Sequence, residues 1–365
     1  MSSSGGASRV LNKLRSSLER GQYYEAHQMY RTLYFRYLSQ QKYPDLFELL
    51  YDGAIRLLDA GQQTSGTELA ELFVEALQKS RTKITEELLL RLEKLFSKIP
   101  STSVASAQSE STKTPPASKK ELADALADRA KFLNGAVSWS KDVSEDEKHK
   151  RMGHPDLHQK FASVFWIEKN YPLARYHFML SNDGEGCASF LVEYQQTCGL
   201  NGEADLFVAQ AVLQYLCYKN KSTAECVFYN YTSEHPKITT GPPFVMPLLN
   251  FIWLLLLCVD LRRVSYFSLL VDQYQTSIKR DPCYLSYLDK IGQIFFGLPP
   301  PKRQPTDGGF IASLLQGLMG GEEESDEQED EEEEYHSTTD SPSPADHLRT
   351  LNGPVQSKFK VEDLD

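Results

Sequence analysis

The stretch SNDGEGCAS, residues 181–189, has the outline of a nucleophile turn, because Cys187 follows two glycines. A cysteine becomes an effective nucleophile when a neighbouring histidine or other cation lowers the pKa of its thiol. No histidine of the chain belongs to a recognisable partner motif, which favours a buried thiol beside a tight turn between two helices. The rival hypothesis, an enzyme centred on Cys187, predicts that this thiol is alkylated at neutral pH.

The second chemical candidate is the pair His154 and His158, whose spacing can place two imidazoles on one helix face for metal binding. Pro155 instead fits the first turn of a helix that begins between them. No further cluster of Cys, His or Asp would complete a metal site, so we expect capping and packing roles. The sequence also lacks a GxxxxGK[ST] phosphate loop, an HExxH helix and a GxSxG elbow. We therefore predict no catalytic residue, metal or cofactor, and no enzymatic activity.

The composition is typical of a soluble globular protein, with 365 residues, 41% hydrophobic residues and a mean hydropathy of -0.44. The formal net charge is -11, and residues 322–334 alone contain eleven acidic residues and no basic one. The rest of the chain is neutral, so we expect no nucleic-acid binding, which needs a basic face. The six cysteines form no CxxC pair, and we expect buried free thiols in a reducing cytosol.

One apolar stretch, FVMPLLNFIWLLLLCV at residues 244–259, raises the question of a membrane span. It contains Pro247 and Asn250 and is shorter than the roughly 20 apolar residues that a spanning helix needs. We predict a buried helix there and no direct membrane insertion. The first residues show no apolar signal region, which favours a cytosolic protein.

Apolar residues recur at helical spacing almost from end to end, and strand signals are nearly absent. This pattern predicts an all-α fold, a right-handed α-solenoid of about seven tetratricopeptide-like helical hairpins, with a disordered acidic C-terminal tail. The expected helix cores are 8–19, 23–39, 44–59, 66–79, 83–98, 119–138, 155–168, 172–181, 185–198, 203–218, 221–234, 245–260, 264–279 and 283–296.

The predicted organisation follows from shifts in composition. The connector 235–243 is expected to be extended and could include a short strand or hairpin. The segments are a disordered N-terminus 1–7, the N-terminal solenoid half 8–139 with a mobile Ser/Thr/Pro-rich insertion 100–120, a linker 140–154, the C-terminal half 155–298, and a mostly disordered tail 299–365 with an apolar motif 308–321 and the acidic run 322–334.

Tyrosines recur where predicted helices begin. The pattern Y-x-x-A occurs at Tyr23–Ala26 and Tyr171–Ala174, with a looser copy at Tyr43–Leu46. Each ring is expected to pack into a groove beside the preceding helix, and each alanine to let the paired helix come close. Gly21 and Gly61 follow helices where a left-handed C-cap is expected.

Two segments could bind partners. On the first helix Leu11, Leu14 and Leu18 share a direction, and a basic stripe lies on the opposite side. The tail motif GGFIASLLQGLMGG has a helical apolar pattern that suits docking into a groove of a partner or of this protein itself. The stripe consists of Arg9, Lys13 and Arg20, and the apolar face of the motif of Phe310, Leu314, Leu315 and Leu318.

Several long strings, in collinear order over residues 9–99 and 151–320, make the chain resemble the Golgi-to-ER traffic protein 4 family. The strings are GQYYEAHQMYRTLYFRYLSQ, GHPDLHQ, NYPLARYHFMLSNDGEGCASFLVEY, DLFVAQAVLQYLCYKNKSTA, GPPFVMPLLNFIWLLLL and RDPCYLSYLDKIGQIFFGLPP. The insertion 100–120 and the acidic run exceed the family pattern without interrupting a matching string.

This resemblance implies a non-enzymatic adaptor in the cytosolic chaperone pathway that delivers tail-anchored membrane proteins to the endoplasmic reticulum, with links to quality control of exposed hydrophobic segments. In the family the N-terminal helices contact the targeting ATPase. The C-terminal helices hold a ubiquitin-like-domain subunit or, in animals, a large BAG-domain scaffold chaperone. Arg9, Lys13 and Arg20 would then face the ATPase, and Phe244 with Phe310, Leu314 and Leu318 would belong to the second site.

A rival hypothesis is a helical-repeat scaffold subunit of another assembly, such as a proteasome-lid-like complex. A C-terminal winged-helix module would support it, and the sequence shows no strand pattern for one.

Overall fold

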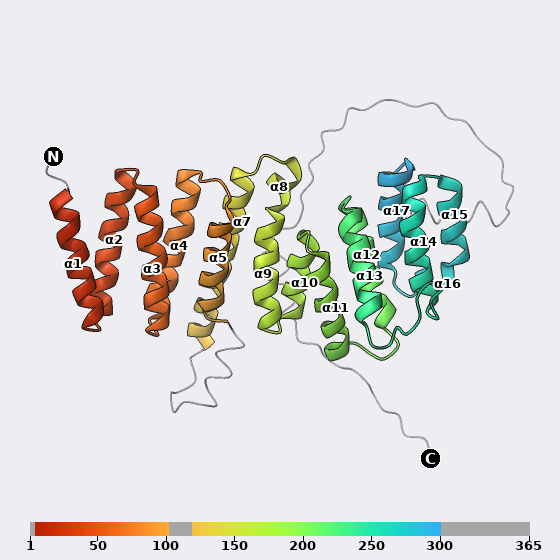
Figure 1. The fold of residues 1–365 in the computed structure, drawn as a ribbon, viewed down its shortest axis with the longest axis horizontal. Helices are drawn as coiled ribbons and strands as arrows, with labels where there is room; N and C mark the ends of the chain where they lie inside the picture. The colour runs from red at the N-terminus through yellow and green to blue at the C-terminus, as the bar shows by residue number, and fades with distance from the viewer. Residues whose placement is uncertain (1–3, 102–118, 301–365) are drawn as a thin grey trace, which may run out of the picture. The chain divides into compact units, whose positions relative to one another are not determined.

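The computed structural model describes residues 4–101 and 119–300, all within one unit of the chain, residues 1–318, and their regular structure is helical (Figure 1). The helices of this described part are α1 (Ser4–Glu19), α2 (Tyr23–Ser39), α3 (Tyr43–Asp59), α4 (Gln63–Ser80), α5 (Glu86–Lys98), α7 (Lys119–Val143), α8 (Glu147–Met152), α9 (Pro155–Ile167), α10 (Tyr171–Leu180), α11 (Gly184–Cys198), α12 (Ala204–Cys217), α13 (Lys221–Glu234), α14 (Pro247–Leu261), α15 (Val264–Gln273), α16 (Gln275–Ile278) and α17 (Cys283–Phe296).

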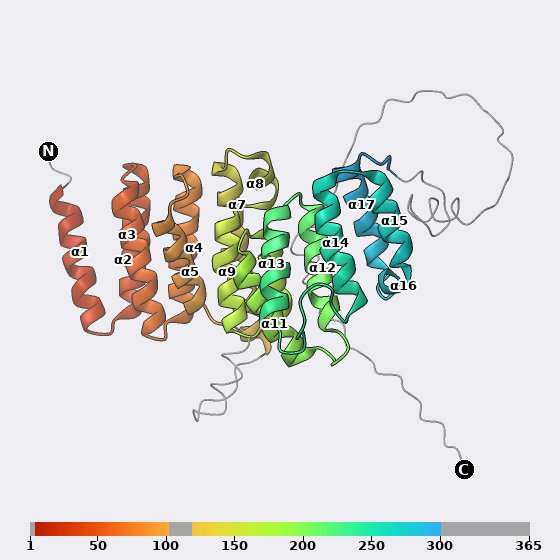
Figure 2. The same cartoon turned by 45° about the vertical axis from the view of Figure 1, so that its right-hand side comes forward.

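Neighbours in sequence are neighbours in space, as the solenoid prediction requires. The closest packing joins α3 with α4, α9 with α10 and α11 with α13, and α17 returns to pack on α12. Figures 1 and 2 show the helices from α1 to α11 following one another along this unit, whereas α17 lies back beside α12. The predicted α-solenoid is confirmed.

The first four helices are joined by turns that share one geometry. Gly21, Gln41 and Gly61 stand at twenty-residue intervals, and each has a positive φ, between 54° and 74°. At the first turn the N–H of Gly21 donates to the carbonyl of Leu18 at 3.1 Å, and the next N–H donates to the carbonyl of Ser17 at 2.8 Å. These are the two bonds of a Schellman cap, which ends a helix and reverses the chain.

The same cap recurs in the C-terminal half. Lys169 and Lys219 have φ values of 60° and 58°, and their N–H groups donate to the carbonyls of Trp166 and Leu216, both at 2.9 Å. The stops between helices are thus one repeated backbone device. The left-handed conformation expected at Gly21 and Gly61 is confirmed, and at five further helix ends a residue with a side chain adopts the same strained conformation: Gln41, Arg81, Lys169, Lys219 and Arg262.

The first tyrosine of the motif is buried in one copy and only half-buried in the other. Tyr171 is buried, its ring stacks on Tyr194 with centroids 4.9 Å apart, and its hydroxyl donates to Glu193 at 2.9 Å. Tyr23 is only half-buried, because α1 is the sole helix before it. The alanines of both copies, Ala26 and Ala174, are fully buried, as close helix approach requires.

Prolines and polar side chains mark several helix starts. Pro44, Pro155 and Pro172 occupy first-turn positions of α3, α9 and α10. The Thr85 hydroxyl accepts the N–H of Leu88 at 3.3 Å and caps α5. Asn220 caps α13 in the same way, through the N–H of Thr223.

Four expectations about the elements need correction. The helix expected at 119–138 continues to Val143, and α8 lies inside the expected linker. The helix expected at 264–279 is divided into α15 and α16. Residues 235–243 contain no strand, although we expected that this connector could include a short strand or hairpin.

The apolar stretch at 244–259 forms most of α14, which packs on α12 and α15. No helix among the described residues is long and apolar enough to cross a membrane.

A buried arginine joins the two solenoid halves. Arg129, on α7, donates to the carbonyl of Ile99, which follows α5. It also donates to the carboxylate of Glu168, which follows α9, over a distance of 2.6 Å. Its guanidinium carbon lies 4.1 Å from the ring centroid of Phe96. Burial raises the pKa of Glu168 and lowers that of Arg129. The attraction and the hydrogen bond between Arg129 and Glu168 oppose both shifts in pKa and favour the charged form of each group.

The repeated cap predicts opposite effects of glycine and alanine at equivalent turns. Gly61→Ala should lower the free energy of unfolding by about 1 kcal/mol, because an added Cβ meets no atom within 4 Å and only the backbone is strained. Gln41→Gly should raise it by up to about 1 kcal/mol. Urea denaturation measures both. Gly202→Ala is the control, because its added Cβ also meets no atom but its φ is not positive, and it should not lower the free energy of unfolding. Equal losses of unfolding free energy at Gly61 and Gly202 would contradict the role of the cap.

The packed tyrosine gives a second test. Tyr171→Ala should cost about 3 kcal/mol or more, because it removes a buried ring and its hydrogen bond. Tyr24→Ala removes a ring that is 77% exposed and should change stability by less than about 0.5 kcal/mol. Equal effects in denaturant unfolding would mean that the ring of Tyr171 does not stabilise its hairpin.

Candidate partner-binding surfaces

The basic stripe lies on the surface of α1. Arg9, Lys13 and Arg20 are all exposed, and Leu14 faces α2 in the core. The predicted apolar face is rotated, however, because Ser17 is buried whereas Leu11 is 36% exposed. Lys13 and Arg20 stand one turn before and after Ser17, so the stripe borders the contact between α1 and α2.

The positive charges of the stripe are not neutralised by neighbours within the described ranges. No carboxylate there lies within ion-pairing distance of Arg9, Lys13 or Arg20. Other cations of the N-terminal half, such as Lys79 and Arg91, are paired with glutamates. The stripe therefore offers charges that an acidic surface can meet without first breaking an ion pair.

One exposed face of α2 carries two aromatic rings that the sequence analysis did not single out. Tyr24 and Phe35 are exposed, at 77% and 60%. Their spacing of three helical turns, with Gln28 and Arg31 between them, was the available signal. An apolar group beside a charged rim is the usual make-up of a protein interface.

The second predicted site is only partly within the described residues. Phe244 is buried and packs edge-on against Phe228, with ring centroids 5.7 Å apart. Its N–H and carbonyl both bond the side chain of Asn250 at 2.7 Å, so it anchors the connector and presents no side chain to a partner. Phe310, Leu314 and Leu318 lie outside the described residues, and their role stays a prediction.

A group of exposed apolar side chains lies on α14 and α15. We call this group the C-terminal apolar surface; it consists of Leu257, Leu261, Val264, Tyr266 and Leu269.

Cys187 has no nucleophilic character. The thiol is fully buried, and burial raises its pKa to about 12. A thiol in this state is protonated and inert at neutral pH, as the structural interpretation predicted. All six cysteines are free, but Cys198 and Cys283 are exposed, so the expectation that all are buried was wrong.

The histidines form a packing cluster. His154 caps α9, with its side chain accepting the N–H of Asp156 at 3.4 Å. His158 is buried, its Nε2 lies 2.9 Å from the carbonyl of Met152, and its Nδ1 lies 2.8 Å from Nδ1 of His177. Because the carbonyl only accepts, His158 Nε2 carries a proton and His177 donates to His158. The second bond requires a neutral His158, and burial, which lowers the pKa of both rings, favours the neutral form of each.

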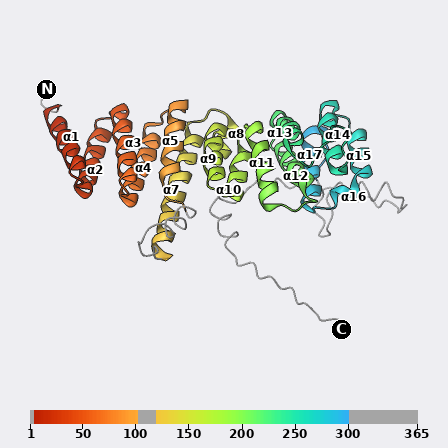
Figure 3. The ribbon, with the colours of Figure 1, turned by 60° about the horizontal axis from the view of Figure 1, so that its bottom comes forward.

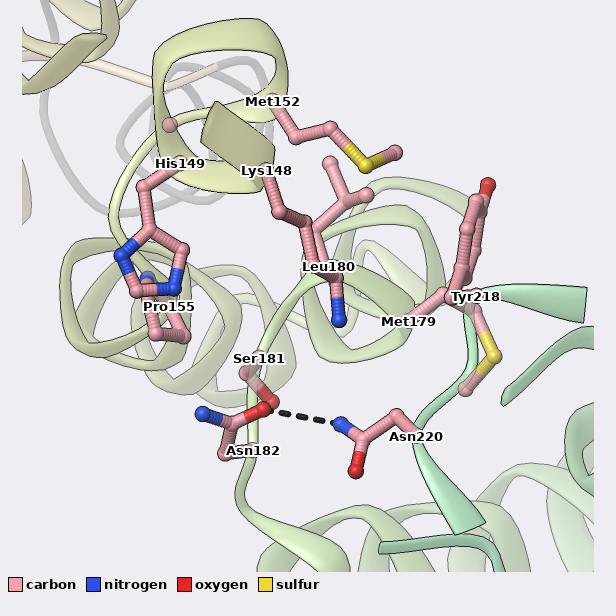
Figure 4. A pocket seen from close by; sticks show the side chains of 11 residues that line it. Lys148, His149, Met152, Pro155, Met179, Leu180, Ser181, Asn182, Tyr218 and Asn220 are labelled. Carbon is pink, nitrogen blue, oxygen red and sulfur yellow. Dashed lines mark hydrogen bonds between the residues drawn. The ribbon is translucent and has the colours of Figure 1, made fainter. Parts of the chain in front are cut away.

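The structure offers no catalytic cleft in its described part. A shallow pocket of about 20 Å³, room for one water molecule, lies between α8 and the starts of α9, α11 and α13 (Figure 4). Lys148 and His149 line one side, and the amides of Asn182 and Asn220, hydrogen-bonded at 2.8 Å, line the other. Among the residues described, no three His, Cys, Asp or Glu side chains gather as a metal site.

Stacked helical hairpins with two exposed candidate surfaces define the class of helical-repeat binding proteins. The family model of Golgi to ER traffic protein 4 matches residues 40–319. A homologue from Oryzias latipes is 50% identical over 87% of this chain and 89% of its own length, and the human homologue is 48% identical over 87% and 88%. The chain belongs to the Golgi to ER traffic protein 4 family.

A solved structure agrees with the fold. The crystal structure of C. therm. Get4 superposes with a TM-score of 0.66 at 23% identity, covering 87% of this chain and 96% of that one.

The buried histidine pair predicts a pH-dependent stability. Burial lowers the pKa of His158 to about 4 and that of His177 well below its usual value. Above pH 6.5 both rings are neutral whether folded or unfolded. As pH falls from 6.5 toward 4, the unfolded histidines bind protons first, so stability should decrease by up to about 1.4 kcal/mol per pH unit for each ring.

Urea unfolding between neutral and mildly acidic pH would measure this slope. The double variant His158→Gln/His177→Gln should flatten it, whatever its own stability, and His149→Gln, on the surface helix α8, should not. Unchanged slopes in the double variant would contradict the assignment.

Proposed function

We propose that the chain is a non-enzymatic adaptor of a cytosolic chaperone complex, which brings tail-anchored membrane proteins to a targeting ATPase for insertion into the endoplasmic reticulum. Family membership supports a role in traffic involving this compartment, since the relatives are named for Golgi to ER traffic. The observation that carries the ATPase contact is the basic stripe on α1, whose cations have no ion-pair partner among the described residues. Participation in quality control of exposed hydrophobic segments belongs to the same proposal.

The position of α1 favours such a contact. Its principal neighbour in the described part is α2, so the rest of its surface faces solvent. Exposed cations there attract an acidic partner surface over several ångströms and accelerate association, and salt weakens that attraction.

Lasting affinity needs apolar burial in addition. Because the stripe borders the α1–α2 contact, a partner that lies across both helices can meet the cations of α1 and the rings of Tyr24 and Phe35 on α2. The charges then guide the partner, and the aromatic rings hold it.

An adaptor also needs a second partner, and we assign this role to the C-terminal half. A ubiquitin-like-domain subunit or a BAG-domain scaffold chaperone would bind there while α1 holds the ATPase. Two proteins held on one scaffold meet at a high effective concentration. The buried thiol of Cys187 and the one-water pocket support a purely binding role.

Charge reversal tests the proposed ATPase contact. Arg9→Glu, Lys13→Glu and Arg20→Glu together should weaken binding to the purified targeting ATPase by tenfold or more at low salt, and less at moderate salt. Because the three side chains are exposed, the melting temperature should change little. Titration calorimetry and thermal unfolding measure the two quantities.

The matched control reverses three exposed lysines elsewhere, Lys94, Lys148 and Lys279, and changes the net charge by the same amount. Equal weakening by both sets would mean that net charge alone matters. Unaltered affinity of the stripe variant would remove the stripe from the interface.

A further inference from the structure

The C-terminal apolar surface spans the end of α14 and the first turns of α15. Leu257 and Leu261 lie one turn apart at the end of α14, and Val264 begins α15 after the two-residue turn. The guanidinium of Arg263, in that turn, lies 6.0 Å from the ring centroid of Tyr266. Leu261 and Leu269 are the most exposed members, both at 58%. Five large apolar side chains left in water favour a cover.

The described chain ends beside this surface. Phe296, the last residue of α17, stacks on Phe267 in the first turns of α15, with ring centroids 4.5 Å apart. Leu298 then packs on the core, next to Gly292. The chain therefore leaves α17 next to the first turns of α15, which include Val264 and Tyr266.

The sequence that follows has the matching chemistry. Phe310, Leu314 and Leu318 recur at helical spacing in a segment that also contains the apolar residues Ile311 and Leu315. The seven residues 301–307 can span up to roughly 25 Å, more than twice the 8–10 Å between packed helices. The family model also extends through this segment to residue 319 and ends before the acidic run.

We propose that residues 308–318 of the same chain cover the C-terminal apolar surface, with Phe310, Leu314 and Leu318 against Leu261, Tyr266 and Leu269. A short tether gives the segment a high effective concentration at the surface, which offsets the weakness of so short a helix. A protein that uses this surface must first displace the segment. The inference concerns the isolated chain and does not depend on the proposed ATPase contact.

Hydrogen exchange of the full chain, followed by mass spectrometry, tests the cover. Amides of residues 310–318 should exchange at least tenfold more slowly than in a free peptide of the same sequence. Leu261→Asp/Leu269→Asp should return them to the peptide rate, and because both side chains are exposed the fold should survive. Leu200→Asp, a 69% exposed leucine after α11, is the control and should leave the protection intact.

The reciprocal variant Leu314→Asp/Leu318→Asp should speed exchange in the first turns of α15. Exchange of the segment at the peptide rate in the unaltered chain would overturn the proposal, as would protection that survives the surface substitutions. Protection that falls on dilution would also overturn it, because the cover would then come from a second copy. Protection that is independent of concentration and lost in both variants supports it.

Discussion

The described solenoid depends on the buried guanidinium of Arg129, because this one group bonds to both halves. It reaches the backbone after α5 through Ile99, the carboxylate after α9 through Glu168, and the ring of Phe96 in the core. A buried charge is tolerated only where its hydrogen bonds are made, so the three elements must keep one arrangement. An adaptor that holds two proteins at a fixed separation needs such a junction between the helices that bind them.

Away from the junction, the fold depends on one helix cap, with a residue of positive φ, that recurs at several turns with different residues. Glycine positions in the turns were predictable, because glycine after an apolar helix pattern is the usual left-handed cap. Gln41, Lys169 and Lys219 adopt the same conformation without that signal, since packing of the flanking helices outweighs a strain of about 1–2 kcal/mol. The six-residue α8 was missed because it buries no side chain and so has no apolar period. Helix periodicity thus predicted the long elements, and tertiary contacts decided the short ones.

Burial of single side chains was predictable where a helix has neighbours on both sides. Tyr171 and Cys187, between helices, are buried as expected, whereas Tyr23 and Leu11 lie at the end of the stack, where fewer helices cover them. The stripe on α1 could be predicted because charge on an amphipathic helix faces solvent. The rings of Tyr24 and Phe35, and the apolar surface on α14 and α15, could not, because apolar residues at helical spacing usually face the core. Their exposure is a property of the assembled helices.

The two candidate surfaces differ in how a partner would reach them. α1 and α15 lie at opposite ends of this unit's row of helices (Figure 3), so occupancy of one surface does not sterically block the other. The basic stripe is open to solvent, and binding there is governed by charge and salt.

The C-terminal apolar surface, if its own chain covers it, binds a partner with an affinity reduced by the fraction of time it is covered. A partner that recognises segment and surface together would avoid this loss, because it would gain the contacts of both. Such an arrangement would protect an apolar surface from aggregation while no partner is bound, and binding at this end would then require displacement of the segment.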